Sequence, residues 1–255
     1  MITSTQNPRI QQVRALLNRR KDRYDAQAFV VEGVRLAEEA IQAGWQAEQI
    51  LFSEQLSPRG REILAAAPKG TEIEQIAPHV MDSLSATETS QGILAVFPMR
   101  RLPLPALDNA LIVDTLRDPG NLGTLLRTAA AAGVQAVLLS PGTTDPFAPK
   151  VVRAGMGAHF KLPIYSLEWD EIAATCQGKL TIYLADVGRG SVFWQTDLRR
   201  PLALIVSNEA EGASPQAAAL ANASIHIPMH RGNESLNAAI AAGILLFEIQ
   251  RQRSQ

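Results

Sequence analysis

Three polar segments of the chain each follow an apolar run and carry side chains that could do chemistry. Their polar residues are Asn121 and Arg127 in the first, Asn208 and Glu209 in the second, and Ser235 and Asn237 in the third. Ligands of open α/β sheets bind at the carboxyl ends of strands. Since each segment follows a predicted strand, the three segments together predict one common site.

The third segment joins a short apolar strand to a helix. Residues 227–237 read Ile-Pro-Met-His-Arg-Gly-Asn-Glu-Ser-Leu-Asn and run into an almost wholly apolar stretch over 238–249. Unpaired backbone N–H groups gather at a helix N-terminus, which suits a polar or anionic ligand. The alternative interpretation is that Ser235 only caps the helix and that Asn237 points to solvent.

The other two segments have structural interpretations of their own. Asn121 is expected to be the N-cap of a helix, with Arg127 in its second turn, where it could simply be solvated. Glu209 could be a solvated loop charge, because Ser214 and Pro215 already supply the cap and first position of the next helix. The glycines beside Asn121 do not form the G-x-G-x-x-G fingerprint, so a dinucleotide site is weakly supported.

Alternating strand and helix patterns position these segments. In the second part of the chain we expect strands over 110–114, 136–140, 162–165, 181–185, 202–207 and 225–229, separated by helices over 122–132, 149–158, 169–176, 215–220 and 236–251. This alternation predicts a parallel sheet with helices on both faces. A smaller α/β unit precedes it, and the expected organisation is a domain over 1–98, a proline-containing linker over 99–108 and a domain over 109–255.

Composition limits the classes of function. The 255 residues are 46% hydrophobic and 19% charged, with a net charge of −1, so the chain is globular and any nucleic-acid contact needs a local basic patch. Cys176 is the only cysteine, and the four histidines show no metal-ligand spacing, so we expect neither a disulfide nor a metal site. No signal peptide or membrane helix is predicted, and a cytoplasmic location is expected.

Together, the three segments resemble the SpoU/TrmH family of RNA 2′-O-ribose methyltransferases in the SPOUT superfamily. Motif one of that family resembles residues 121–129, motif two resembles 205–212, and motif three resembles 227–229 followed by 234–237. Order and separation also agree, and the resemblance covers about 110–251. The N-terminal part is similar to the substrate-binding domain often attached to these enzymes, through residues 3–8 and Val31-Glu-Gly33.

The resemblance implies a fold and a reaction. The expected fold class is α/β, with a C-terminal parallel-sheet SPOUT domain that contains a deep trefoil knot, preceded by a smaller ribosomal-protein-like domain. The expected reaction transfers a methyl group from S-adenosylmethionine to a ribose 2′-OH of structured RNA, more in keeping with rRNA than with tRNA. Ser207 and Ala210 stand where the family usually has glycines, so a modest reshaping of the cofactor loop is expected.

The resemblance also assigns roles to residues. The expected catalytic group comprises Arg127, Asn121, Glu209, Ser235 and Asn237. Arginine is effectively always protonated, so we expect Arg127 to bind a phosphate and stabilise the developing alkoxide, with the proton passing elsewhere. The expected cofactor-binding residues are Thr115, Ser207, Asn208, Glu209, Gly212, Ile227, Met229, Ser235 and Leu236.

Two surfaces complete the expectations. RNA is expected to contact basic residues, namely Arg9, Arg19, Arg20, Lys21, Arg23, Arg153 and Arg231. Leu236, Ile240, Gly243, Ile244 and Phe247 form one stripe of the last helix, while Leu245, Leu246 and Ile249 lie elsewhere around it. Two apolar faces need two partners, so a homodimer through the C-terminal knotted domain is expected.

Three other functions fit parts of the sequence. The altered motif two could belong to an RNA-binding homologue with impaired catalysis, and the methylated RNA could be a tRNA. A nucleotide-dependent oxidoreductase on a doubly wound sheet is disfavoured by the missing fingerprint. The sequence does not identify the target RNA, the nucleotide or its base, nor the proton acceptor.

Overall fold

The computed structural model describes residues 1–86, 89–208, 210–230 and 235–254. Internal contacts divide the chain into two compact units. The first unit contains Met1–Arg100 and Phe147–Phe160, and the second contains Arg101–Pro146 and Lys161–Gln255.

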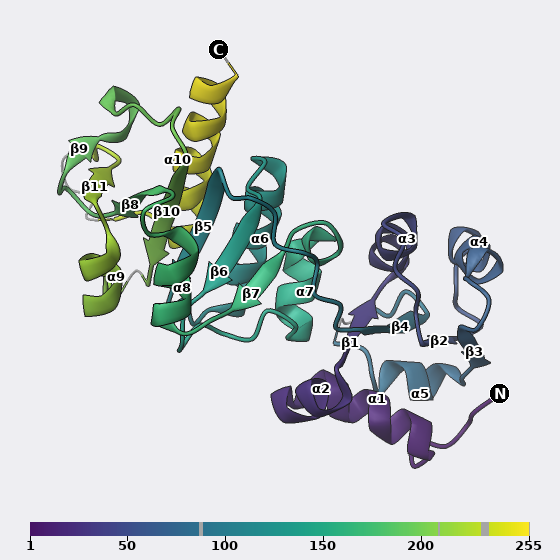
Figure 1. Cartoon of the computed structure of the whole chain (residues 1–255). Helices are drawn as coiled ribbons and strands as arrows, with labels where there is room; N and C mark the ends of the chain where they lie inside the picture. The colour runs from purple at the N-terminus through teal and green to yellow at the C-terminus, as the bar shows by residue number, and fades with distance from the viewer. Residues whose placement is uncertain (87–88, 209, 231–234, 255) are drawn as a thin grey trace. The chain divides into compact units, whose positions relative to one another are not determined.

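The first unit is built on a four-stranded sheet in the order β1-β4-β2-β3. Its strands are β1 (Ala28–Glu32), β2 (Gln49–Phe52), β3 (Glu72–Gln75) and β4 (Ile93–Pro98). Its first five helices are α1 (Pro8–Asn18), α2 (Arg20–Ala26), α3 (Val34–Gln42), α4 (Pro58–Ala66) and α5 (Pro78–Asp82). In Figure 1, α1, α2 and α5 lie on one side of this sheet and α3 and α4 on the other, which buries apolar side chains on both faces.

A segment far along the chain completes the first unit. It contains α7 (Pro149–Gly155) and η1 (Ala158–Phe160), and α7 contacts β1. The Phe29 ring of β1 lies 5.0 Å from the Phe147 ring and 6.3 Å from the Phe160 ring, centre to centre. The Trp45 indole N–H donates to the Phe160 carbonyl oxygen at 3.1 Å. The sequence pattern groups this segment with the C-terminal strands, but its aromatic side chains pack against Phe29 and Trp45 of the first unit.

The second unit is built on a seven-stranded sheet in the order β7-β6-β5-β10-β8-β11-β9. Every strand pair is parallel. The strands are β5 (Asn109–Asp114), β6 (Ala136–Leu139), β7 (Ile164–Ser166), β8 (Thr181–Ala185), β9 (Ser191–Val192), β10 (Leu202–Ser207) and β11 (Ala223–His226). The predicted parallel sheet is therefore confirmed, and only the two-residue β9 lacks a counterpart among the expected strands.

Helices cover both faces of this sheet (Figure 1). On one face, α6 (Pro119–Ala131) packs beside α10 (Ala238–Arg253). On the other, α8 (Trp169–Cys176) and α9 (Pro215–Leu220) contribute to a buried cluster with the strands. A short helix, η2 (Phe193–Gln195), follows β9. The expected helix bounds differ from those of the structure at the termini, which are determined by the cap residues.

The strand order has one unusual feature. β10 lies between β5 and β8, although both of these precede it in the chain. It pairs along its whole length with β5 and through Leu202–Ile205 with β8. A late strand therefore fills a gap between two earlier ones, and its carboxyl end, Val206 and Ser207, is paired with β5.

The link between β8 and β9 contains two glycines with positive φ. Gly188 has φ 69° and no heavy atom within 4 Å of a potential Cβ. Gly190 has φ 79°, and a Cβ there would collide with the carbonyl oxygen of Ser224. Gly190 thus lets this link pass directly against β11, whereas Gly188 supplies only backbone freedom.

This difference predicts unequal effects of adding a methyl group. Gly188→Ala should cost only the left-handed strain, about 1–2 kcal/mol, whereas Gly190→Ala should cost more because β11 must also move. Thermal unfolding measures both, at about 2–4 °C per kcal/mol for chains of this size. Equal losses of melting temperature in the two variants would contradict the close approach to Ser224.

Candidate active site

The carboxyl ends of four strands meet at one edge of the second sheet. Register pairs Ser207 of β10 with Asp114 of β5, and Ile225 of β11 with Ala185 of β8. The polar segments after β5, β10 and β11 therefore begin side by side, as expected for an open parallel sheet.

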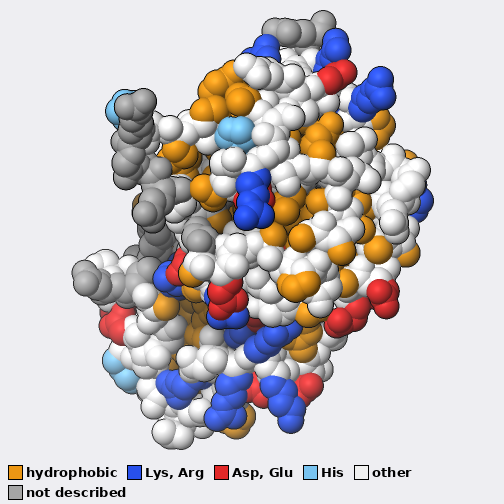
Figure 2. All heavy atoms as spheres, turned by 90° about the vertical axis from the view of Figure 1, so that its left-hand side faces the viewer, with side chains coloured by type: hydrophobic (Ala, Val, Ile, Leu, Met, Phe, Trp, Pro, Cys, Tyr) orange, Lys and Arg blue, Asp and Glu red, His pale blue; other side chains and the backbone are white. Residues whose placement is uncertain are grey.

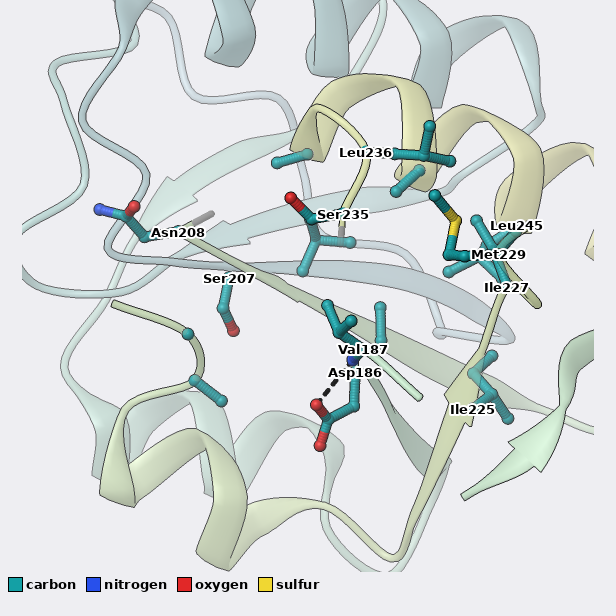
Figure 3. A pocket seen from close by; sticks show the side chains of 16 residues that line it. Asp186, Val187, Ser207, Asn208, Ile225, Ile227, Met229, Ser235, Leu236 and Leu245 are labelled. Atoms are coloured by element: carbon teal, nitrogen blue, oxygen red, sulfur yellow. Dashed lines mark hydrogen bonds between the residues drawn. The ribbon is translucent and has the colours of Figure 1, made fainter. Parts of the chain in front are cut away.

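A pocket of about 770 Å³, partly open to solvent, lies at this edge. Figure 3 shows Met229, Ile227 and Leu245 gathered at one side and Ser207 and Asn208 at the other. Most of the predicted cofactor residues line it, namely Ser207, Asn208, Gly212, Ile227, Met229, Ser235 and Leu236.

One predicted cofactor residue does not line the pocket, and another lies outside the described residues. Thr115 does not line the pocket, but it has φ 52° and its carbonyl oxygen accepts a hydrogen bond from Asn208 Nδ2 at 3.4 Å. Thr115 thus supports motif two through its backbone. Glu209 lies outside the described residues, so its expected roles stay predictions.

Some pocket residues were missed by sequence reasoning. Asp186 and Val187 directly follow β8, and Ala238, Ala241 and Leu245 come from the first turns of α10. The strand-end rule that selected Asn208 could also have selected Asp186, because β8 is a neighbour of β10. The α10 residues carry no such signal, since their side chains are typical of a helix core.

The loop after β10 is a tight turn tied to β5. Gly212, with φ 71°, donates its N–H to the Asn208 carbonyl oxygen at 3.0 Å. The N–H of Ser214 donates to Oδ2 of the fully buried Asp114 at 2.8 Å. Among the described non-glycine residues, neither Ser207 nor Ala210 has a positive φ. Glycine's conformational range is therefore not needed at these two positions.

The structure corrects the expected start of α6. The N-cap is Asp118 rather than Asn121, and its side chain accepts a hydrogen bond from the Asn121 N–H at 2.7 Å. Pro119 occupies the first helical position, where its missing N–H is harmless. Asn121 is therefore within the first turn, and its side-chain amide is available for another role.

That role is a contact between motifs one and three. Asn237 Nδ2 donates to Asn121 Oδ1 at 2.9 Å. Asn237 is also the N-cap of α10, accepting from the N–H groups of Ala239 and Ile240. The alternative interpretation, with Ser235 as the cap and Asn237 in solvent, is therefore wrong, and Ser235 lines the pocket instead.

Arg127 lies on α6 with an exposed side chain. In the described part of the chain no group accepts a hydrogen bond from its guanidinium. An exposed, unshielded cation at this position is suited to an anionic partner such as a phosphate.

The predicted RNA-contacting arginines have different surroundings. Arg23 is only 4% exposed and donates to the Leu16 carbonyl oxygen at 2.7 Å, so its expected RNA contact is corrected to a structural role between α1 and α2. Arg153 contacts Glu32 at 3.2 Å, and Arg9 forms ion pairs with Glu72 and Glu74. Arg231 lies outside the described residues.

The remaining basic residues lie on the surface of the first unit. Arg19, Arg20 and Lys21 are exposed where α1 passes into α2, and the Arg20 guanidinium lies 5.2 Å from the centre of the Tyr24 ring. Figure 2 shows Lys and Arg side chains gathered at the lower end of the face drawn, where Figure 1 places these helices. These residues form the local basic patch that a nucleic-acid contact requires in a chain whose net charge is −1.

Two other chemistries, a cysteine nucleophile and a metal site, find no support among the described residues. Cys176 is fully buried, and burial raises the pKa of its thiol to about 11, opposed by the nearby charge of Lys179. A neutral thiol is a poor nucleophile. The described residues contain no group of three or more His, Cys, Asp or Glu side chains that could hold a metal ion. They also contain no helix with the length and apolar character of a bilayer span.

A parallel sheet whose strand-end loops enclose a pocket with apolar and polar sides is the arrangement of a ligand-binding α/β protein. Comparisons with known proteins specify the class. The SpoU rRNA Methylase family profile matches residues 108–247, and the MRM3-like substrate binding domain profile matches residues 7–95. The chain is 30% identical over 253 residues to the 23S rRNA (guanosine(2553)-2′-O)-methyltransferase RlmP of Bacillus subtilis, with 98% of each chain covered.

Solved structures agree. The SpoU methyltransferase AviRb from Streptomyces viridochromogenes, in complex with the cofactor AdoMet, has a TM-score of 0.88 at 31% identity, covering 98% of this chain and 99% of that one. An AdoMet-bound rRNA methyltransferase from Sinorhizobium meliloti has a TM-score of 0.88 at 30% identity, covering 98% and 97%.

The chain belongs to the SpoU rRNA methylase family. The predicted family, the parallel SPOUT-type sheet and the class of enzyme, an RNA methyltransferase, are thereby confirmed. The predicted cofactor agrees with the AdoMet bound in both relatives. The oxidoreductase interpretation is wrong.

The double role of Asn237 predicts separable effects. Asn237→Ala should destabilise the fold by about 1 kcal/mol through the lost cap and also release Asn121. Asn237→Ser should retain most of the cap, because serine is a good N-cap residue, but still lose the contact with Asn121. We expect near-normal thermal unfolding of the serine variant with a methyl-transfer rate as low as that of the alanine variant. A normal rate for Asn237→Ser would show that only capping matters.

Proposed function

We propose that the pocket binds S-adenosylmethionine and that the enzyme methylates a ribose 2′-OH of ribosomal RNA. The observation that carries this proposal is the convergence of motifs two and three on one pocket, with Asn121 of motif one bonded to Asn237 beside it. The rRNA part rests on the similarity of residues 7–95 to a substrate-binding domain and on the rRNA specificity named for the relatives. A tRNA substrate is the alternative outcome of the test.

The pocket fits the cofactor chemically. Ile225, Ile227 and Leu245 offer an apolar side for an adenine ring, while Asp186 and Ser207 offer polar atoms for the attached sugar. The Ser207 hydroxyl oxygen is buried and has no hydrogen-bond partner among the described residues. A buried orphan hydroxyl in a ligand pocket is satisfied when a polar ligand binds.

The chain's own residues then have defined tasks. Bound S-adenosylmethionine supplies an electrophilic methyl group. Arg127, which stays protonated, binds the phosphate beside the acceptor ribose and stabilises negative charge as the 2′-oxygen loses its proton. Asn237 and Asn121 fix each other and the start of α10, and Ser235 orients the ribose. The proton passes to a group other than Arg127.

A homodimer through α10 is part of the proposal. Ile240, Ile244 and Phe247 are 56%, 38% and 48% exposed and follow one another at helical spacing. The opposite side of α10, including Ala242, Leu246 and Ile249, is buried in its own unit. The exposed stripe therefore suits a second copy of the chain. The trefoil knot, which the family resemblance implies, is likewise proposed, and the late insertion of β10 between β5 and β8 is consistent with it.

The activity is tested with RNA from cells that lack this protein. Purified enzyme and radiolabelled S-adenosylmethionine should label the rRNA fraction, and nuclease digestion should release a single 2′-O-methylated nucleotide. Labelling confined to tRNA would overturn the rRNA assignment, and no labelling together with no cofactor binding in calorimetry would overturn the enzymatic function.

Within that assay Arg127 gives a specific prediction. Arg127→Ala should lower the single-turnover rate by about 10²–10³, the effect of removing one preorganised charge-stabilising group, without changing the affinity for S-adenosylhomocysteine. Arg127→Lys should recover only part of the rate. Arg61→Ala, an exposed arginine of α4, is the matched control. A full rate with a normal pH profile for Arg127→Lys would exclude a specific guanidinium role.

The proposed homodimer is tested by measuring the molecular mass of the protein in solution. The double substitution Ile240→Glu and Ile244→Glu should convert a dimer into a monomer in sedimentation equilibrium, because charges replace apolar contact area. Ile73→Glu, at a 43% exposed position of β3, is the control and should leave the mass unchanged. A monomeric wild-type protein would contradict the proposed interface.

A further inference from the structure

Two polar side chains stand next to each other on the floor of the pocket. Ile205 of β10 is paired with Leu184 of β8 in a parallel ladder, so two residues later Ser207 comes beside Asp186. Both residues line the pocket, and Figure 3 shows the Ser207 hydroxyl and the Asp186 carboxylate on the same side of it. Most of their neighbours in the lining are apolar.

The Asp186 carboxylate is held in one orientation. Its Oδ1 accepts a hydrogen bond from the Val187 N–H at 2.7 Å, and its backbone N–H donates to the Ile225 carbonyl oxygen at 3.0 Å. No described residue donates a hydrogen bond to Oδ2. The carboxylate therefore keeps one oxygen for a ligand and does not need to reorganise to use it.

These groups specify the kind of ligand atom. An ionised carboxylate only accepts hydrogen bonds, whereas a serine hydroxyl both donates and accepts. The ligand must therefore bring at least one donor to Asp186 and a hydroxyl-like group to Ser207. Two adjacent hydroxyls on one sugar ring meet both requirements.

The position of these two side chains within the pocket indicates which hydrogen-bond donors of the cofactor they can reach. Ser207 lies on the polar side of the pocket, and Asp186 lies between it and the apolar side formed by Ile225, Ile227 and Leu245, where a flat ring would pack. The ribose is bonded directly to that ring, while the ammonium group stands at the end of a flexible chain. We propose that Asp186 Oδ2 and Ser207 Oγ bind the 2′- and 3′-hydroxyls of the cofactor ribose, an assignment that rests on the proposed function of the pocket.

The proposal is tested by calorimetric binding of S-adenosylhomocysteine and of its 2′-deoxy and 3′-deoxy analogues. Asp186→Ala should weaken S-adenosylhomocysteine by about 10- to 100-fold, as for a lost hydrogen bond to a charged group, and Ser207→Ala by about 3- to 10-fold. At least one deoxy analogue should bind the wild type more weakly than S-adenosylhomocysteine does. The affinity of that analogue should fall little further in Asp186→Ala, because the missing hydroxyl and its acceptor form one interaction.

Control variants distinguish the loss of this contact from a loss of the folded structure. Asp170→Ala, an exposed carboxylate in the first turn of α8, should bind like the wild type. Asp186→Asn should restore part of the affinity, since an amide oxygen also accepts. Thermal unfolding verifies that each variant is folded, and Ser207→Ala provides a second route if Asp186→Ala is not.

The outcomes are distinguishable. Equal losses in Asp186→Ala for S-adenosylhomocysteine and both deoxy analogues would overturn the proposal. The proposal would also be overturned if Asp186→Ala caused no loss of affinity for an analogue that lacks the amino group, because Asp186 would then bind the ammonium. A wild type that binds no S-adenosylhomocysteine would overturn the proposed function itself, whereas tight binding insensitive to both substitutions would overturn only the ribose contact.

Discussion

The pocket depends on the position of β10 between β5 and β8. This strand is hydrogen-bonded on both sides, and its residues from Leu202 to Val206 are buried. An interior strand of a parallel sheet cannot slip by one residue without turning its apolar side chains to the wrong face and breaking two ladders. Ser207 and Asn208, at its end, are therefore placed by the sheet rather than by the loop that follows.

A few polar contacts extend this order into the loops. Asp114 accepts the N–H of Ser214 and so ties the loop after β10 to the neighbouring strand. Asn237 caps α10 and bonds to Asn121 of α6. Each asparagine contact contributes little net free energy, about 0.5–1.5 kcal/mol. Their value lies in geometry, because they hold segments from distant parts of the sequence at one sheet edge.

Local patterns predicted much of this arrangement. Apolar runs identified all but one strand of the second unit, and the strand-end rule together with the family resemblance identified seven of the 16 residues that line the pocket. What failed depended on long-range contacts. Asn121 and Asp118 are both good caps, and only the helix geometry shows that Asp118 is used. A run of basic residues does not reveal that Arg23 bonds to a backbone carbonyl and is buried. Strand order cannot be read from the succession of strands in the sequence, so the neighbours of β10, and with them the position of Asp186 in the pocket, are seen only in the fold.

The segment from Phe147 to Phe160 limits how freely the two units could be exchanged between proteins. It leaves the second unit between β6 and β7, supplies aromatic partners to Phe29 and Trp45 in the first, and then returns. A fragment ending near residue 100 would lack those partners and expose an aromatic cluster. Recombination at the single junction near residue 100 would therefore leave one piece of the substrate-binding unit behind. The two units are best regarded as interleaved parts that must be inherited together, and chimaeras with other substrate-binding domains need to carry this segment along.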